Sequence, residues 1–303
     1  MWRSPQHPMN ELLTKIQHTT RHAKQVGALH SLTTAQEVIV DHGIPFVVRI
    51  LEQLDRKENY QAKQEKAKVN PFLPYEQDLF VCDLTPHHVC LLNKFNVVDH
   101  HILIITREFQ PQETWLMEAD FTALAHCLQR LDGLAFYNAG AIAGASQPHK
   151  HLQLIPFQSN GETFSVPIDQ VLSQLNDRMQ PQQIPLFPFM HGIISLPQDY
   201  DGKILFDCYL ALLRFLRFID GPLNPGWQTQ AYNLLVTRRW MLLVQRAQDQ
   251  YEKIPVNSLG FAGALLVRNQ MQLSLLKKLT PLQLLASVAA RGDLSQRAIA
   301  PFE

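Results

Sequence analysis

A run of small residues that leads directly into an alternating strand is the feature that most constrains this chain. The run spans 139–147, carries Gly140 and Gly144 between alanines, and ends on Ser146 and Gln147. Glycine lets backbone N–H groups come close to an anion, and the hydroxyl and carboxamide side chains add further donors. The segment therefore predicts a loop that holds phosphate groups.

The strand after this loop places three polar side chains on one face. It reads His149-Lys150-His151-Leu152-Gln153-Leu154-Ile155-Pro156. Alternate residues of a strand point the same way, so His149, His151 and Gln153 share a surface while Leu152 and Leu154 point into the core. A neutral imidazole, with a pKa near ~6.5, is a competent nucleophile at phosphorus, and the N–P bond it forms can be passed on. Loop and strand together indicate covalent nucleotidyl transfer.

Two other interpretations of this stretch are weaker. A Gly/Ala loop is often only a tight turn, and a single histidine among thirteen is usually structural. Zinc binding by His149 and His151 would need further ligands, and no Cys or Asp/Glu cluster is near them in the sequence. The cysteines form no CxxC pair, and we interpret all four as reduced core residues: Cys82, Cys90, Cys127 and Cys208.

Charge and hydropathy exclude several classes of partner. The 27 basic side chains balance 27 acidic ones, which leaves no overall field for a nucleic acid or an anionic membrane. No apolar run approaches the ~20 residues needed to span a bilayer. Residues 1–10 have no apolar stretch of signal-peptide length. We therefore expect no nucleic-acid partner, no membrane association and a cytoplasmic location.

The order of the elements predicts an α+β fold with a mainly antiparallel sheet flanked by helices, since strands and helices do not alternate as βαβ units. Helices are expected near 10–25, 114–131, 168–179 and 204–218, and strands near 79–82, 88–92, 101–106, 135–138, 149–156, 232–236 and 240–245. We divide the chain into an N-terminal catalytic half, residues 1–165, with the HxHxQ strand, and a C-terminal half, residues 166–303, packed against it in one compact unit.

The motif HKHLQ resembles the active-site strand of the histidine-triad superfamily, in the transferase branch where Gln takes the third histidine position. Galactose-1-phosphate uridylyltransferase belongs to that branch, so the resemblance implies a histidine-triad-like fold. The longer string, with Asn138, the loop 144–147 and His149-Lys150-His151, is similar to the ATP adenylyltransferases, also called diadenosine tetraphosphate phosphorylases. Further segments that look like that family are 70–72, 79–81, 92–97, 232–235 and 259–263.

The resemblance implies roles for individual residues. His151 is the nucleophile, His149 aligns it, and Gln153 contacts the transferred phosphoryl group. A larger set is implied to bind nucleotide and phosphate: Lys57, Asn93, Lys94, Asn138, Gly144, Ala145, Ser146, Gln147, Asn257 and Arg268. No residue is expected to ligate a metal. No cofactor is expected to be tightly bound, and magnesium enters only as a companion of the charged polyphosphate.

The implied reaction is phosphorolysis of diadenosine tetraphosphate. Substrate and phosphate give ATP and ADP, or the reverse, through an AMP adduct on His151. Three alternatives remain open: a hexose-1-phosphate uridylyltransferase that prefers UDP-sugar, a histidine-triad dinucleoside polyphosphate hydrolase that uses water, and a non-catalytic nucleotide sensor.

Three polar residues elsewhere are interpreted as structural. Arg238 and Arg239 stand between two apolar strands, where exposed hairpin arginines are commoner than phosphate ligands. His191, close to Phe187 and Phe189, is expected to be a core histidine with satisfied hydrogen bonds.

Overall fold

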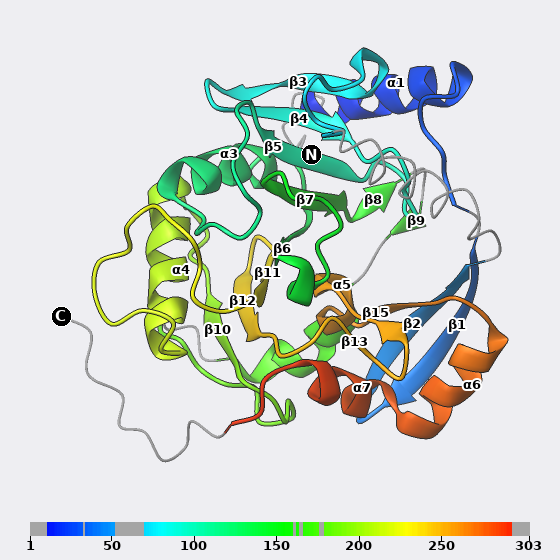
Figure 1. The fold of residues 1–303 in the computed structure, drawn as a ribbon, viewed down its shortest axis with the longest axis vertical. Coiled ribbons are helices and arrows are strands. Elements are labelled where there is room, and N and C mark those ends of the chain that lie inside the picture. The colour runs from blue at the N-terminus through cyan, green and yellow to red at the C-terminus, as the bar shows by residue number, and fades with distance from the viewer. Residues whose placement is uncertain are drawn as a thin grey trace, which may run out of the picture.

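A large antiparallel sheet forms the centre of the molecule (Figure 1). The computed structural model describes residues 11–32, 34–51, 70–159, 162–163, 166–175 and 179–292. The predicted ligand residue Lys57 lies outside these ranges. The sheet has eight strands in the order β10-β12-β11-β6-β7-β5-β4-β3, and all neighbours are antiparallel. The predicted α+β class with a mainly antiparallel sheet is confirmed.

The strands of the large sheet come from both halves of the sequence. They are β3 Phe80–Thr85, β4 His88–Leu92, β5 Ile102–Thr106, β6 Gly133–Ala139, β7 His151–Pro156, β10 His191–Ser195, β11 Tyr232–Val236 and β12 Trp240–Gln245. The hairpin of β11 and β12 has the predicted bounds. Strand β7 begins two residues later than predicted, because His149 makes only an isolated bridge with Pro111. Strands β6 and β7 lie at the centre of the sheet, so the small-residue loop that connects them lies at the middle of the sheet.

Three helices cover one face of the large sheet: α1 Glu11–Gln25, α3 Glu118–Leu128 and α4 Gly202–Phe215. Their apolar residues share one core cluster with Leu152 and Leu154 of β7, as the alternation predicted. Helix α3 was predicted to start at 114 but starts at Glu118. Thr114 instead bridges Trp227, and the backbone N–H of Met117 donates to the Asp120 carboxylate at 2.8 Å, which caps the helix there.

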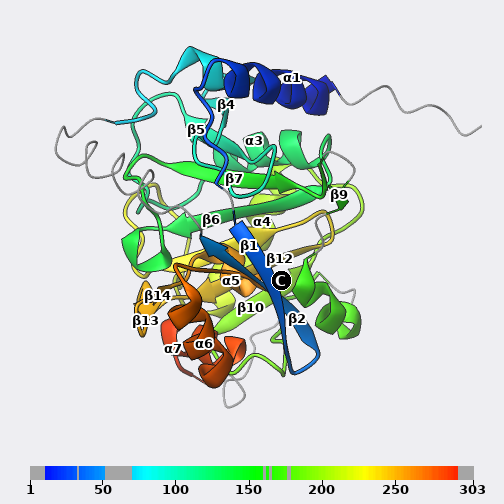
Figure 2. The same cartoon turned by 90° about the vertical axis from the view of Figure 1, so that its right-hand side faces the viewer.

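A smaller sheet, which we did not predict, packs on the other side of the molecule. It consists of β1 Thr34–Asp41, β2 Ile44–Leu51 and β15 Ala264–Val267, with β15 parallel to β2. Figure 2 shows this sheet near α6 Gln270–Leu279 and α7 Pro281–Val288, at the end of the molecule opposite α1. Its apolar residues belong to a second core cluster, together with one face of β6 and β12.

The predicted helix over 168–179 is wrong. Pro167–Gln174 forms a 3-10 helix, and Leu175 has extended backbone with ψ of 133°, which ends the helical stretch. The buried Ile168 and Leu172 pack into the second core, and the partly buried Val171 and Leu175 pack against it. The remaining short elements are η1 Gln77–Leu79, η2 Ala141–Ala143, β8 Gln158–Ser159, β9 Glu162–Thr163, β13 Gln250–Tyr251, β14 Ile254–Pro255 and α5 Ser258–Phe261.

Several predictions about single residues are confirmed. All four cysteines are free, three buried and Cys82 half-buried. His191 is fully buried, with Nδ1–H donating to the Phe189 carbonyl at 2.8 Å and Nε2 accepting from the Ile184 N–H at 2.8 Å. Arg238 donates to the Leu128 carbonyl, and Arg239 pairs with Asp169. Among the helices of the described ranges, none combines the length and apolarity needed to cross a bilayer.

Candidate active site

A cavity of about 550 Å³ lies between the large and the small sheets. Residues of β4, β6 and β7 line it from the large sheet, and residues of β2 and β15 line it from the small one. It brings together most of the predicted site residues: Asn93, Lys94, Asn138, Gly144, Ala145, Ser146, Gln147, His151, Gln153 and Asn257. His149 and Arg268 do not line it.

His151 presents one ring nitrogen to the cavity. Its Nδ1 lies 2.7 Å from the carbonyl oxygen of His149. A carbonyl oxygen only accepts, so Nδ1 carries the hydrogen and Nε2 carries the lone pair. The ring packs against Phe72, with centroids 5.4 Å apart. Burial lowers the pKa of His151 to about 4, although the hydrogen bond to the His149 carbonyl opposes this. The imidazole is therefore a neutral, oriented nucleophile at physiological pH.

The ring of His149 is turned away from the cavity. Its Nε2–H donates to the Thr106 carbonyl at 2.8 Å, and its Nδ1 accepts from the Asn70 amide at 3.0 Å. Burial lowers the pKa of His149, which keeps it neutral. Both ring nitrogens are thus engaged within the protein. His149 contacts the nucleophile through its backbone carbonyl, while its ring anchors the start of the strand.

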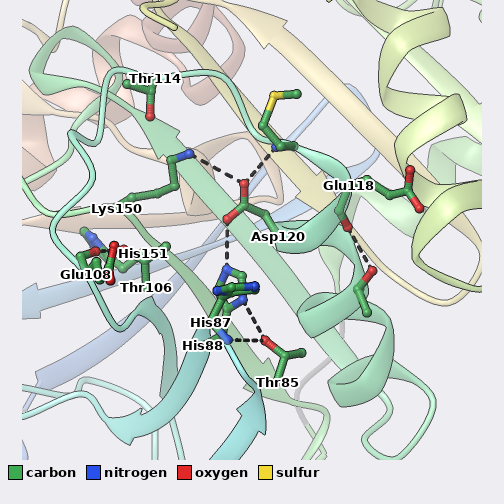
Figure 3. A network of polar contacts seen from close by, with 12 residues as sticks. Thr85, His87, His88, Thr106, Glu108, Thr114, Glu118, Asp120, Lys150 and His151 are labelled. Carbon is green, nitrogen blue, oxygen red and sulfur yellow. Dashed lines mark hydrogen bonds and ion pairs between the residues drawn. The ribbon is translucent and has the colours of Figure 1, made fainter. Parts of the chain in front are cut away.

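Lys150, between the two histidines, belongs to a buried ionic network on the other side of the strand (Figure 3). Its ammonium donates to the Trp115 carbonyl at 2.9 Å and lies 3.5 Å from the Asp120 carboxylate. The same carboxylate accepts from His88 Nε2 at 2.9 Å. Burial alone would raise the pKa of Asp120, but the His88 hydrogen bond and the Lys150 charge outweigh it and lower that pKa. The network ties Lys150, the residue before β7, to α3.

The small-residue loop folds back on itself. The N–H groups of Ala143 and Ala145 donate to the Gly140 carbonyl, and that of Gly144 donates to the Ala141 carbonyl. Gly144 has φ of +89°, and a Cβ there would lie 2.9 Å from Cβ of Asn257. Only glycine fits this position. The N–H groups of Ala143, Gly144 and Ala145 are therefore used within the loop, while Ala141 and residues 144–147 line the cavity.

Asn138 is oriented by its neighbours. Its Oδ1 accepts from the Asn233 amide at 2.9 Å, from the Ser258 N–H at 3.0 Å and from the Ser258 hydroxyl at 2.7 Å. With the oxygen fully used, Asn138 offers its amide nitrogen to a ligand in the cavity.

A buried arginine, which we did not predict, supports Asn138 from behind. The Arg246 guanidinium donates to Asn233 Oδ1 at 2.6 Å and stacks over Phe261 at 5.4 Å. Burial lowers the pKa of Arg246 to about 10. Local sequence patterns carry no signal for these contacts. They run from Asn138 of β6 through Asn233 of β11 to Arg246, which follows β12 and lies 108 positions from Asn138 in the sequence.

Asn93 and Lys94 lie at the cavity wall as the resemblance implied. Asn93 contacts His101 Nδ1 at 3.2 Å, and Lys94 pairs with Glu76 at 2.6 Å. The small sheet adds Arg49 of β2 to the same wall, a cation that sequence reasoning missed. Lys94 and Arg49 give the cavity two cationic side chains suited to an anionic ligand.

Asn257 and Arg268 occupy different environments. Asn257 caps the four-residue helix α5 and lines the cavity beside Gly144. Residues 264–266 of β15 line the cavity, and the strand ends at Val267. Arg268 follows the end of the strand and is exposed. The structure does not bring Arg268 into the site.

Comparison with known proteins gives two family matches. Residues 3–174 match the Ap4A phosphorylase N-terminal domain, and residues 185–291 match the ATP adenylyltransferase C-terminal domain. The first match alone spans more than half of the chain.

Curated proteins and solved structures give the same result. The chain is 29% identical to diadenosine 5',5'''-P1,P4-tetraphosphate phosphorylase 2 of Saccharomyces cerevisiae, over 78% of this chain and 79% of that one. It is 32% identical to protein APA1 of the same yeast, over 59% and 61%. The crystal structure of yeast Ap4A phosphorylase Apa2 superposes with a TM-score of 0.78 at 25% identity, covering 94% of this chain and 96% of that one. The Apa2 complex with Ap4A gives 0.77 at 26% identity, over 93% and 98%.

Proposed function

The chain belongs to the Ap4A phosphorylase family, and on that premise we propose that it catalyses the phosphorolysis of diadenosine tetraphosphate (Ap4A) to ATP and ADP, and the reverse reaction. The observation that carries the proposal is the state of His151: neutral, fixed in one tautomer, and directed with its Nε2 lone pair into a cavity lined by phosphate-compatible groups.

The reaction proceeds in two displacements. His151 Nε2 attacks the phosphorus next to one adenosine, the bond to the bridging oxygen breaks, and ATP leaves with that electron pair. An N–P bond now joins AMP to His151. An oxygen of inorganic phosphate then attacks the same phosphorus, the N–P bond breaks, and ADP leaves while the imidazole regains its lone pair.

The surroundings of His151 favour this sequence. The ring becomes positive when the N–P bond forms, and the Nδ1–H that faces the His149 carbonyl at 2.7 Å stabilises that charge. Gln153, two residues further along the same face, lines the cavity and can donate a neutral hydrogen bond to a non-bridging oxygen. Asn138, the loop 144–147 and Lys94 bind the nucleotide and its phosphates.

Magnesium enters the proposal only with the polyphosphate. Among the described residues, Glu76 and Asp249 are the carboxylates that line the cavity, and Glu76 is already paired with Lys94. The same part of the chain holds no group of three potential metal ligands. A magnesium ion would therefore be coordinated mainly by the phosphate oxygens and water.

The test is an assay of purified protein on Ap4A with and without phosphate. We expect ATP and ADP only when phosphate is present. Without phosphate, quenching should trap an acid-labile, alkali-stable AMP adduct that maps to His151 and is missing from His151→Ala. ATP and AMP formed from Ap4A without phosphate would indicate a hydrolase. Turnover of a UDP-sugar with a hexose 1-phosphate, in place of Ap4A, would indicate a uridylyltransferase. Binding of Ap4A without turnover would indicate a sensor.

A further inference from the structure

The strands that carry Asn138 and His151 separate where the cavity begins. Strands β6 and β7 pair regularly up to Phe136 and Gln153. Two residues further on, the same register would place Asn138 directly opposite His151, where the two would exchange ladder hydrogen bonds. They do not pair, and the side chain of Gln112 stands between them.

The carboxamide of Gln112 replaces the missing ladder bonds. Its Nε2 donates to the Asn138 carbonyl at 2.8 Å and to the His151 carbonyl at 3.3 Å, and its Oε1 accepts from the His151 N–H at 2.8 Å. One buried side chain therefore holds the backbone of the nucleophile and the backbone of the nucleotide-binding asparagine together.

Gln112 is itself fixed in place. Its N–H donates to the Pro148 carbonyl at 2.7 Å, and its carbonyl accepts from the Tyr137 hydroxyl. The preceding residue, Pro111, bridges His149. The segment before α3 is thus laid against the start of the catalytic strand, and the side chain enters the gap in a single orientation.

We propose that Gln112 is a positioning residue that sets the spacing between His151 and Asn138 for the covalent step, an inference that rests on the proposed function. The gap requires a group that donates and accepts at once and reaches both strands. Without it the strands would close into a regular ladder or admit water. Either change moves the His151 ring relative to the nucleotide.

Two substitutions distinguish a role of Gln112 in positioning His151 from a role only in the stability of the fold. Gln112→Ala removes all three side-chain hydrogen bonds. Gln112→Glu keeps the shape, but an ionised carboxylate has no hydrogen to donate to the two carbonyls, whereas a protonated carboxyl has one donor and one acceptor. Burial beside carbonyl oxygens raises the pKa of such a carboxyl, so its donor form is restored as the pH falls.

The experiment measures single-turnover formation of the AMP adduct from Ap4A without phosphate, together with AMP affinity and thermal stability. For Gln112→Ala we expect adduct formation to slow by ~10²-fold, as for a misplacement of about 1 Å, with AMP affinity changed less than about threefold. For Gln112→Glu the rate relative to wild type should rise as the pH is lowered from about 8 to about 5.5.

Gln129→Ala is the matched control. The Nε2 of Gln129 makes one hydrogen bond, to the Tyr200 carbonyl, away from the cavity. The adduct rate of this variant should equal that of wild type.

Two results would overturn the inference. One is a folded Gln112→Ala protein with wild-type adduct formation. The other is a Gln112→Glu protein whose relative rate does not change with pH, and this second variant decides the matter if Gln112→Ala fails to fold. Failure of the wild-type protein to form any adduct would reject the proposed covalent function instead, and the inference with it.

Discussion

The protonation state of His151 sets how its reactivity depends on pH. Because burial depresses its pKa to about 4, the imidazole stays unprotonated across the range in which a free histidine, with a pKa near ~6.5, becomes charged. Ap4A has no terminal phosphate that titrates near neutrality. We therefore predict that adduct formation is nearly constant from about pH 8 to about pH 5 and declines below that. Rapid quenching at a series of pH values measures it, and a rate that halves near pH 6.5 would contradict the burial argument.

The same depressed pKa affects stability. Between about pH 6.5 and pH 4 the unfolded chain binds a proton at this position and the folded chain does not, so His151 lowers the stability progressively as the pH falls through that window. His191, with its pKa also lowered to about 4 by burial, acts in the same direction. Between about pH 6.5 and pH 5 the rate of adduct formation should therefore stay constant while the free energy of unfolding falls, and one series of pH values can measure both.

Gln153 provides a second test at the level of single residues. Gln153→Ala removes a neutral donor from the face that carries His151, and by analogy with the loss of an oxyanion donor we predict turnover slower by ~10²–10³-fold with a smaller effect on substrate binding. Single-turnover kinetics and AMP titration measure the two effects. If Gln153→Ala keeps the wild-type single-turnover rate, Gln153 is only structural.

At the scale of elements, we predict that Asp120 of α3 and Lys150, the residue before β7, stabilise the fold only when both are present. Asp120→Asn removes the negative charge that faces the buried Lys150 ammonium, and removing one partner of a buried ion pair costs about 3–5 kcal/mol. Lys150→Met in the same chain removes the unpaired charge. We expect Asp120→Asn with Lys150→Met to lose less stability than the two single losses added.

Urea unfolding of the four proteins in this cycle measures the coupling. Because neither Lys150 nor Asp120 lines the cavity, AMP affinity of the folded variants should match that of wild type. Additive losses of stability would show that Asp120 and Lys150 act independently.

The elements differed in how far the sequence could predict them. The strict alternation of β7 and the apolar runs of β11 and β12 are local patterns, and they predicted the strands and the face that carries His151 and Gln153. The parallel pairing of β15 with β2 joins positions more than 200 residues apart, and no local pattern encodes it. Arg49 and Gln112 escaped prediction for the same reason, since each reaches the site only through tertiary packing.

Local patterns were also wrong in places besides the helix over 168–179. The pattern over 114–131 predicted a longer α3, but the Asp120 cap fixes the start at Glu118. The pair His149 and His151 suggested two imidazoles facing one ligand, whereas only one does. The difference arises because Thr106 and Asn70, which fix the His149 ring, lie on other segments of the chain.

At the scale of the whole molecule, the two halves of the chain share one sheet. Strand β11 pairs with β6 from Tyr232 opposite Ala139 to Val236 opposite Ala135, so the strands of the C-terminal half extend the sheet of the N-terminal half. Helices α3 and α4, one from each half, also pack together, with Phe121 and Phe206 at 5.9 Å. Separating the halves would expose an unpaired strand edge on both sides and open the first core cluster.

We therefore predict that the chain unfolds as one cooperative unit. Trp115 lies in the N-terminal half and Trp240 in the C-terminal half, and both are buried, so variants that retain only one of them report on each half separately. Their fluorescence midpoints in urea should coincide with each other and with the loss of far-ultraviolet circular dichroism. If AMP binds the folded site, as the proposed function requires, it should move both midpoints by the same amount. Two distinct midpoints, or a shift by AMP of only the Trp115 transition, would show that the halves fold independently despite the shared sheet.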